Sequence, residues 1–349
     1  MCTLLSRRAG LGLVTSGPVL LASRCMNQTS GGFLQPNDPN SPGGLPRFAG
    51  HTTMMRLPTM APGDAAEKLN ACFLGVPMDW GTCNRPGTRY GPRYIRCESS
   101  LLRPYNTSTG AAPFESLQVA DIGDVPVNPY SLPKSVACIE DFVSGLGSCR
   151  PLSMGGDHTV TLPILRALAK EHGKMALLHI DAHSDTESSM FGEDVAHGTT
   201  FYRACVEGLI DPTLSTQIGL RGGDYGPGDY DWTKEQGFHM VWATDCWYKS
   251  MVPLMETVRT RVGQQPLYIS FDIDGLDPSI APGTGTPEIG GLTTPQALEI
   301  IRGAQGLNVV GCDLVEVSPP YDVSNMTALT AANLLFEMLC VLPGVKYHK

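Results

Sequence analysis

Three short motifs place histidines and aspartates directly after apolar runs of strand length. They read Gly155-Gly156-Asp157-His158, Asp181-Ala182-His183-Ser184-Asp185 and Asp272-Ile273-Asp274. Alternate side chains of an extended segment point to the same side, so D-x-H-x-D and D-x-D each present several donors together. One such signal after one strand is usually structural. Three of them, after three separate strands, indicate one shared site.

The predicted site combines carboxylates with imidazoles. Its members are His158, Asp181, His183, Asp185, Asp272 and Asp274. Carboxylates without counter-charge in one cleft repel each other and lose hydration, so either their pKa values rise or cations lie among them. This oxygen-rich set with two histidines suits two Mn²⁺ ions, although the residue types alone leave the metal open. Paired ions can hold one bridging water and lower its pKa toward neutrality.

The elements that must position these residues are short apolar runs. The runs are Ala71–Pro77, Leu117–Asp121, Pro151–Met154, Met175–Ile180, Thr216–Leu220, His239–Ala243, Pro266–Phe271 and Val309–Val315. Most are apolar on both faces, which is typical of a parallel sheet covered on both sides. Helices are expected between and after them, at Pro92–Leu102, Lys134–Leu146, Thr161–His172, Leu254–Val262, Pro295–Gly303 and Leu329–Leu342. The alternation predicts a single three-layer α/β domain whose central, mostly parallel eight-stranded sheet is flanked by helices, with the site beyond the carboxyl ends of the strands.

Composition and charge exclude several classes of protein. Hydrophobic residues make up 42% of the chain and charged residues 17%, which allows a large core. The net charge is −9 and no basic stripe is present, so we expect no nucleic-acid partner. The longest apolar run, Leu11–Ala22, is too short to span a membrane. The cysteines are odd in number, 11, without C-x-x-C spacing, and this predicts buried free thiols in a reducing compartment.

The first segment has the composition of a targeting sequence. No acidic residue precedes Asp38, whereas three arginines lie among Ser, Thr, Leu, Gly and Ala residues. This composition predicts a mitochondrial transit peptide. A cytosolic tail and a secretory signal are the alternatives, and Pro18 and the cysteine pattern disfavour secretion. We expect the transit peptide at 1–36, a linker rich in Pro, Gly, Asn and Ser at 37–51 and the catalytic domain at 52–349.

The motifs resemble those of the ureohydrolase family of arginases and agmatinases. The resemblance extends from about Met55 to Cys340 and includes Ser270–Pro278 and Ala281–Glu288. Within the family, Asn84–Gly87 and Gly311–Asp322 are most similar to guanidino acid hydrolases of vertebrate mitochondria. The resemblance implies an arginase-like fold, two Mn²⁺ per subunit, assembly into trimers or hexamers, and hydrolysis of a guanidino compound to urea and an amine.

The resemblance also implies a role for each site residue. One Mn²⁺ would be bound by His158, Asp181, Asp185 and Asp272, and the other by Asp181, His183, Asp272 and Asp274. Asp185 would in addition hold the bridging hydroxide in line for attack on the guanidinium carbon. His197 would relay a proton to the departing amine. Glu316 would bind the substrate guanidinium through a charge-assisted pair.

Several nearby residues are weaker candidates. Thr284 and Thr286 lie in a glycine-rich loop that is expected to be a turn, with Thr286 a secondary candidate for substrate binding. His179, inside the fourth apolar run, is expected to be a core residue or to support the ligands. Cys312 and Asp313 are expected to support the end of the eighth strand.

Three positions bear on which guanidino compound is bound. Arginases have an asparagine two places after D-x-H-x-D and an aspartate after a later strand, but this chain has Glu187 and a glycine of Arg221–Asp224 there, so arginine is not expected. Arg85 could bind a carboxylate with its bidentate fork, whereas Glu187 would favour an amine. With the resemblance, we expect short guanidino acids such as 4-guanidinobutanoate and 3-guanidinopropanoate. Agmatine is the alternative.

Two other hypotheses compete with this activity. A metal-dependent deacylase of a related fold uses one zinc, but His183 and Asp274, which only a second ion would need, are both present. The alternative from another class is a non-catalytic regulatory member of the family. Such chains usually lose metal ligands, and here the set is complete.

Overall fold

The computed structural model describes residues 32–223 and 226–349. The predicted transit peptide, up to residue 31, therefore lies outside the described residues. Leu34 and Gln35 contact the body of the protein: the backbone N–H of Leu34 donates to Oε1 of Gln118 (3.1 Å), and the Gln35 amide donates to the carbonyl of Phe114 (2.6 Å). Residues 37–51 contain turns but no helix or strand. The predicted boundaries at 36 and 51 stay predictions.

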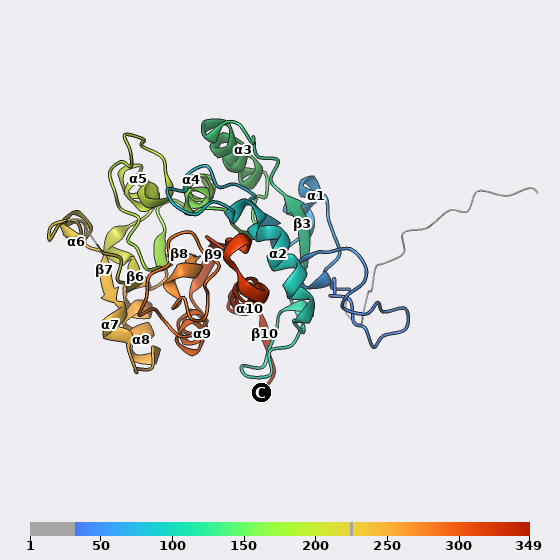
Figure 1. The fold of residues 1–349 in the computed structure, drawn as a ribbon. Coiled ribbons are helices and arrows are strands. Elements are labelled where there is room, and N and C mark those ends of the chain that lie inside the picture. Colours follow the sequence, from blue (N-terminus) through green and yellow to red (C-terminus); the bar gives the residue numbers. More distant parts are fainter. Residues whose placement is uncertain (1–31, 224–225) are drawn as a thin grey trace, which may run out of the picture.

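A parallel sheet forms the centre of the molecule (Figure 1), and its strand order is β3-β1-β4-β9-β8-β5-β6-β7. The strands are β1 (Ala71–Gly75), β3 (Val119–Asp124), β4 (Arg150–Met154), β5 (Ala176–Ile180), β6 (Thr216–Leu220), β7 (His239–Trp242), β8 (Pro266–Asp272) and β9 (Asn308–Val315). Every neighbouring pair is parallel. All eight predicted strands are confirmed to within three residues at either end.

Helices cover both faces of this sheet (Figure 1). They are α1 (Pro62–Lys68), α2 (Gly91–Glu98), α3 (Leu132–Ser144), α4 (Thr161–His172), α5 (Thr200–Val206), α6 (Asp231–Gln236), α7 (Ala243–Cys246), α8 (Val252–Val262), α9 (Thr294–Gly303) and α10 (Met326–Cys340). Helices α3, α4 and α5 pack together and contribute to one apolar core, whereas α2, α8, α9 and α10 contribute to a second. The predicted three-layer α/β domain is confirmed.

The predicted helices are present, but four short ones were not predicted. These are α1, α5, α6 and α7, none longer than seven residues. Helices this short are not stable alone and depend on tertiary packing, so their sequences carry little periodic signal. A two-stranded antiparallel sheet of β2 (Ala111–Ala112) and β10 (Lys346–Tyr347) was also missed, because two-residue strands have no readable alternation. Within the described residues, no helix is long and apolar enough to cross a membrane.

The middle of the sheet positions the predicted ligands. Strands β4, β9, β8 and β5 are consecutive neighbours. His158, Glu316 and Asp181 follow β4, β9 and β5, and Asp272 is the last residue of β8. Because parallel strands end at the same edge, motifs separated by more than a hundred residues meet there.

Candidate metal centre

The turn after β4 brings two of the predicted site residues into contact. A Cβ atom at Gly156 would lie 1.6 Å from the carbonyl oxygen of Met78, so only glycine fits this turn. The Gly156 carbonyl accepts a hydrogen bond from the backbone N–H of Glu316 (2.9 Å). In return, Oε1 of Glu316 accepts the backbone N–H of His158 (2.9 Å). The ends of β4 and β9 are thus joined at the site.

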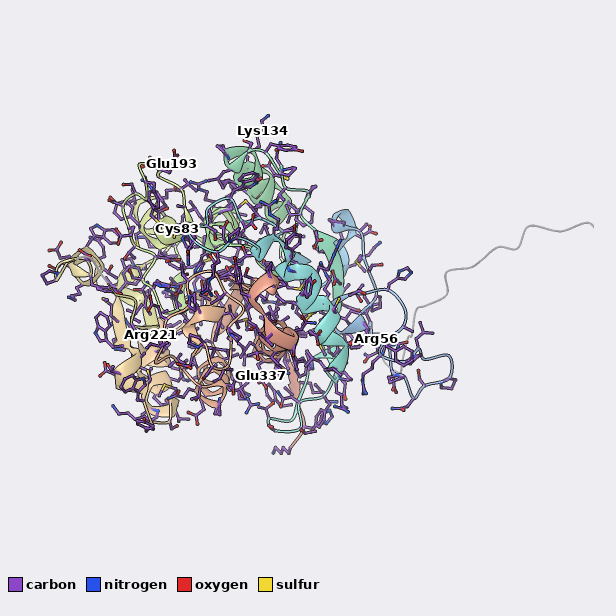
Figure 2. All side chains as sticks on the ribbon, viewed as in Figure 1. Arg56, Cys83, Lys134, Glu193, Arg221 and Glu337 are labelled. Carbon is purple, nitrogen blue, oxygen red and sulfur yellow. The ribbon has the colours of Figure 1, made fainter. Side chains whose placement is uncertain are left out.

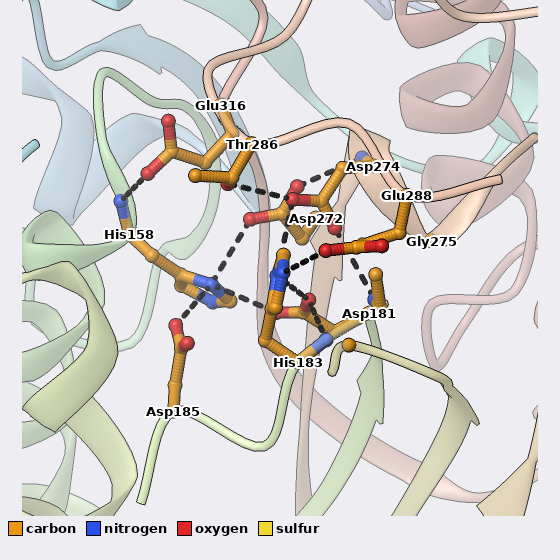
Figure 3. A network of polar contacts seen from close by, with 12 residues as sticks. His158, Asp181, His183, Asp185, Asp272, Asp274, Gly275, Thr286, Glu288 and Glu316 are labelled. Carbon is orange, nitrogen blue, oxygen red and sulfur yellow. Dashed lines mark hydrogen bonds and ion pairs between the residues drawn. The ribbon is translucent and has the colours of Figure 1, made fainter. Parts of the chain in front are cut away.

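The imidazole of His158 faces three carboxylates (Figure 3). Its Nδ1 atom lies 3.2 Å from Asp181 Oδ2, 3.0 Å from Asp185 Oδ2 and 3.3 Å from Asp272 Oδ2. None of these contacts has hydrogen-bond geometry, and Nδ1 is buried without a partner. Four electronegative atoms therefore surround one small volume.

Hydrogen bonds on the far side of the ring determine which nitrogen of His158 is unprotonated. Nε2 lies 2.8 Å from Oγ of Ser270, and that hydroxyl donates to Oδ1 of Asp313 at 2.7 Å. Ser270 must therefore accept the Nε2 proton, which leaves the Nδ1 lone pair directed at the carboxylates. A histidine held this way is prepared to bind a metal. Asp313, expected only to support its strand, also fixes this tautomer.

A second histidine faces the other side of the same cluster (Figure 3). Nδ1 of His183 lies 3.4 Å from Asp181 Oδ1 and 3.3 Å from Asp274 Oδ2. Asp181 thus directs one oxygen to His158 and the other to His183. Asp272 contacts His158 through Oδ2 and accepts the backbone N–H of Asp274 through Oδ1 (2.8 Å). The six predicted ligands therefore form two adjoining groups that share Asp181.

The buried carboxylates lack a permanent counter-charge. Among the described residues, Asp181, Asp185, Asp272 and Asp274 form ion pairs only with histidines. Burial, followed by the charges of Asp274 and Asp181, raises the pKa of Asp272 well above its usual range. Burial opposes charge on His158, yet the three carboxylates raise its pKa well above the ordinary value. Cations are strongly favoured in this volume, and the donor set fits a pair of divalent ions.

His179 lies beside the cluster but is not free to bind a metal. Its Nε2 is 2.8 Å from Asp181 Oδ2, and its Nδ1 is 3.0 Å from the Gln217 amide nitrogen. That nitrogen also donates to the carbonyl of Ser184 (2.7 Å), which orients the amide. Nδ1 therefore accepts and Nε2 donates to Asp181. His179 thus orients Asp181, one of the predicted ligands.

Strained backbone accompanies two of the site residues. Asp185 has φ 51° and Glu316 has φ 63°. Both values lie in the left-handed region of backbone conformation, which residues other than glycine rarely adopt. Such a conformation costs about 1–3 kcal/mol and is retained where the surroundings require it, commonly at functional sites. At both positions it turns a carboxylate toward the cluster of histidines and aspartates.

His197 and Glu316 lie together next to the cluster. Nδ1 of His197 is 3.2 Å from Oε1 of Glu316, and both side chains are buried. The other carboxylate oxygen, Oε2, is buried without a hydrogen-bond partner. Burying an unpaired carboxylate oxygen is unfavourable, so Oε2 is a ready acceptor for a cationic donor. The pairing of Glu316 with a guanidinium stays a prediction.

Cys83 is one of the residues beside the cluster that sequence reasoning missed. Its Sγ atom lies 3.1 Å from Nε2 of His197, and the residue is exposed. The nine described cysteines are all free, as expected, but the prediction that the thiols are buried is wrong for Cys83 and for Cys97. The position of Cys83 directly before the quoted Asn84–Gly87 motif was the available signal.

Asp157 also was not assigned a role, although it belongs to a quoted motif. It is fully buried and accepts the backbone N–H groups of Gly81 (2.8 Å) and Thr159 (2.9 Å). Burial and then the Glu316 charge raise the pKa of Asp157 to about 6. The Gly81 carbonyl in turn accepts the His197 backbone N–H at 3.2 Å. Asp157 thus anchors the loop that carries Cys83.

The glycine-rich loop after β8 approaches the cluster through Thr286. Its hydroxyl donates to Asp274 Oδ2 at 3.2 Å, so this residue does more than complete a turn. The Thr284 hydroxyl is buried without a partner. Glu288, which had no predicted role, places Oε1 3.9 Å from Nε2 of His183. Arg221 holds the loop by donating to carbonyl oxygens that include those of Asp274 and Glu288.

Arg85 lies at the edge of the site. Its guanidinium stacks over the Tyr321 ring, 5.1 Å from the ring centroid, and no hydrogen bond or ion pair joins it to the predicted ligands among the described residues. A Cβ atom placed on Gly285 would lie 3.3 Å from the Arg85 carbonyl and 3.5 Å from Oε2 of Glu316. Glu187 is exposed, and its backbone N–H donates to the carbonyl of Gly198 (3.0 Å).

Comparisons with known proteins agree with this geometry. A model of the Arginase family matches residues 69–340. The chain is 60% identical to a protein of Pseudomonas aeruginosa named guanidinobutyrase, over 86% of this chain and 95% of that protein. It is 57% identical to the human protein named guanidino acid hydrolase, mitochondrial, over 88% of each chain. The structure of proclavaminate amidino hydrolase from Streptomyces clavuligerus is similar, with a TM-score of 0.79, 37% identity and coverage of 85% of this chain and 100% of that one.

Proposed function

Because the chain belongs to the arginase family, we propose that it hydrolyses short guanidino acids, such as 4-guanidinobutanoate and 3-guanidinopropanoate, to urea and an amine. It is a hydrolase that acts on C–N bonds of guanidino compounds. One observation supports the proposal most directly. The unpartnered Nδ1 of His158 faces three carboxylates, and the unpartnered Oε2 of Glu316 lies on the neighbouring strand end.

We assign two Mn²⁺ ions to the cluster. One would be held by His158, Asp181, Asp185 and Asp272, and the other by Asp181, His183, Asp272 and Asp274. When bound, such a pair supplies Lewis acidity and a water of lowered pKa. The direct contacts of Asp181 with both histidines support its role as a shared ligand. Asp185, held toward His158 by its strained backbone, would orient the attacking water.

Glu316 and His197 would act on the substrate. Oε2 of Glu316 accepts N–H groups of the guanidinium in a charge-assisted pair that also neutralises the buried carboxylate. His197 holds a proton at Nδ1, on the side that faces Glu316, and donates it to the departing amine. Although burial opposes charge, its contacts with Cys83 and Glu316 raise the pKa of His197 well above the ordinary value. Thr286, beside Asp274, is a further candidate contact for the guanidinium.

The tail of the substrate distinguishes the two candidate activities. Arg85 is half-buried at the edge of the site and would bind a carboxylate tail through its fork. Glu288 near His183 and the exposed Glu187 instead favour an amine tail, so agmatine is the second candidate. The loss of the Arg85 charge should therefore affect the two substrates differently.

A urea-release assay with Mn²⁺ tests the proposal. The full chain should prefer 4-guanidinobutanoate or 3-guanidinopropanoate to agmatine, and arginine should be poorest. Arg85→Leu should raise KM for the guanidino acid about 10- to 100-fold, since a hydrogen bond to a charged group contributes about 1.5–3 kcal/mol, and leave KM for agmatine unaffected. Arg93→Leu, at an exposed arginine of α2, is the control. A preference for agmatine would favour the second candidate, and no urea from any guanidine would favour the non-catalytic alternative.

We also propose mitochondrial import through residues 1–36 and assembly into a homotrimer or hexamer. The human relative's name includes the word mitochondrial. Imaging the full chain with a C-terminal tag should show mitochondria, and removal of 1–36 should make the signal cytosolic. Light scattering should give three or six times the mass of one chain. A diffuse signal from the full chain, or a monomeric mass, would contradict the respective proposal.

A further inference from the structure

Cys83, His197 and Glu316 form a linear series of polar contacts. Cys83 Sγ is 3.1 Å from His197 Nε2, and His197 Nδ1 is 3.2 Å from Glu316 Oε1. His197 is 8% exposed and Glu316 1%, whereas Cys83 is exposed. The order of thiol, imidazole and carboxylate is that of an activated nucleophile, in which a base takes the thiol proton and a third group orients the base. The proposed hydrolysis makes no use of this thiol.

We propose that Cys83 is a covalent modification site at which small neutral electrophiles, including hydrogen peroxide, react and thereby inactivate the enzyme through His197. The reactivity of the thiol stands on its own contacts. The inactivation rests on the proposed function, because it requires His197 to serve as the proton donor.

The surroundings of Cys83 favour its thiolate, which is the reactive form of cysteine. The hydrogen bond from His197 lowers the pKa of Cys83 and outweighs burial and the Glu316 charge, which act in the opposite direction. Cys97 is also exposed, but burial and then the Glu98 charge raise its pKa. Residues 32–223 and 226–349 therefore contain two exposed thiols whose pKa values shift in opposite directions, and Cys97 is an internal reference.

A cavity gives small molecules access to the thiol. It has a volume of about 700 Å³ and lies between the loop that carries Cys83, helix α3 and residues 190–196. In Figure 2, Cys83 lies below the loop that carries Glu193. Three acids and one arginine line the cavity, and most of them are paired: Glu140 with Lys170 (2.7 Å), Asp194 with Arg203 (2.5 Å) and Arg166 with Glu207 (2.6 Å). Glu193 has no ion pair among the described residues, and its charge should favour neutral reagents over anionic ones.

In both modifications, the Cys83 thiolate displaces a leaving group from the reagent. With hydrogen peroxide, the thiolate attacks one oxygen, an S–O bond forms, the O–O bond breaks and hydroxide leaves. The sulfur is oxidised by two electrons to a sulfenic acid, which a thiol reductant reverses. With iodoacetamide, an S–C bond forms and iodide leaves. Either product removes the thiolate that faces Nε2 of His197.

Limited labelling of the Mn²⁺-loaded full chain with iodoacetamide, followed by peptide mapping, tests the reactivity. At pH 7, Cys83 should be labelled severalfold faster than Cys97, because the thiolate is the reactive form and the two thiols have pKa values shifted in opposite directions. His197→Asn should slow labelling of Cys83 and leave Cys97 unchanged. Relative to a free thiol, Cys83 should discriminate against iodoacetate. Equal rates at Cys83 and Cys97 would overturn the proposal, whatever the urea assay shows.

Inactivation is tested separately, with each variant compared with its own untreated rate. Urea release should fall in parallel with Cys83 labelling, and peroxide inactivation should be reversed by dithiothreitol. Cys83→Ser should keep its starting rate under treatment, while Cys97→Ser should lose activity as the unmodified sequence does. Rapid labelling of Cys83 without loss of urea release would overturn the link to His197. If no guanidine yields urea, the proposed function fails, and the labelling rates still decide whether Cys83 is reactive.

Discussion

Two groups of carboxylates lie at the same sheet, one around buried Asp121 on β3 and the other after β5 and at the end of β8, and only the first has its own counter-charge. On β3, Asp121 is paired with Arg96: Nε lies 2.8 Å from Oδ2 and Nη2 lies 3.0 Å from Oδ1. Asp124 contacts the same guanidinium, and Asp121 also accepts backbone N–H groups of Met54 (2.7 Å) and Gly123 (2.9 Å). Every oxygen of Asp121 is therefore satisfied within the chain.

The carboxylates after β5 and β8 have only imidazoles beside them. Nδ1 of His158 has no hydrogen-bond partner although it lies within 3.3 Å of Asp181, Asp185 and Asp272. The comparison shows that buried acidity alone does not identify a metal centre. Buried carboxylates that face an unpartnered imidazole nitrogen, with no Arg or Lys beside them, do indicate one, because a bound cation stabilises that arrangement.

The largest effect is expected from removing one carboxylate of the group after β5 and at the end of β8. Asp272→Asn should reduce urea release on the order of 10³-fold or more, since even changes to residues that only orient ligands cost 10–100-fold. The metal-free variant should be as stable as the metal-free parent, because a repulsive charge is lost. Asp64→Asn, in an exposed pair with Lys68, is the control and should retain full activity. Near-normal turnover of Asp272→Asn would contradict the ligand assignment.

Removing the counter-charge of the first group should instead destabilise the fold. Arg96→Leu leaves buried Asp121 unpaired and should cost about 3–5 kcal/mol of unfolding free energy, measured by chemical denaturation. Mn²⁺ should not restore this loss, and Asp121→Asn added to Arg96→Leu should recover part of it. Arg166→Leu, which breaks the part-exposed pair with Glu207, should cost less than about 1 kcal/mol. Equal losses of unfolding free energy in Arg96→Leu and Arg166→Leu would contradict the expected difference between a buried and a part-exposed ion pair.

When a chelator removes the metal, the stability of the protein should depend on pH, because His158 and the carboxylates after β5 and at the end of β8 can then take up protons. The pKa of His158 is raised above its ordinary value of 6.5, so the stability it contributes is present below pH 6.5 and is lost as pH rises through the folded-state pKa. Burial and neighbouring charges also raise the pKa of Asp272. Its ionisation at higher pH therefore lowers the stability of the folded protein as well. From pH 6.5 upward, the metal-free protein should therefore become less stable as the pH rises.

The metal-loaded protein should not follow this trend, because bound cations replace the protons and bind more tightly as pH rises. Melting temperatures measured with a chelator and with Mn²⁺ across the same pH range provide the test. Metal-free Asp272→Asn should show a shallower dependence than the metal-free parent. Parallel curves with and without metal would show that the cluster does not hold cations.

The smallest expected effect compares two threonines of one loop. Thr286→Val removes a hydroxyl that donates to Asp274 and should weaken Mn²⁺ affinity or raise KM up to about tenfold, in line with about 0.5–1.5 kcal/mol for one hydrogen bond. Thr284→Val removes a buried hydroxyl without a partner and should leave both quantities unchanged. Metal titration and urea-release kinetics on both variants measure the difference. Equal effects of Thr286→Val and Thr284→Val would show that Thr286 does not contribute to the site.

The sequence by itself determined the eight central strands and the places where the chemistry begins. Strands such as β5 are short, apolar on both faces and followed at once by polar residues, so each could be recognised from local pattern. His158, Asp181 and Asp272 were identified for the same reason, since each lies within four residues of the end of such a run. The resemblance to the family then supplied the roles of His197 and Glu316, which no local pattern predicts.

Only the tertiary structure decided which groups are paired and which are left without a partner. Cys83 and His197 are 114 residues apart, and nothing local to either indicates that the thiol meets the imidazole. The tautomer of His158 likewise depends on Ser270 and Asp313, which reach it from two other strands. Hydrogen bonding and burial depend on distances between segments remote in sequence, so they become definite only when the sheet brings those segments to one edge.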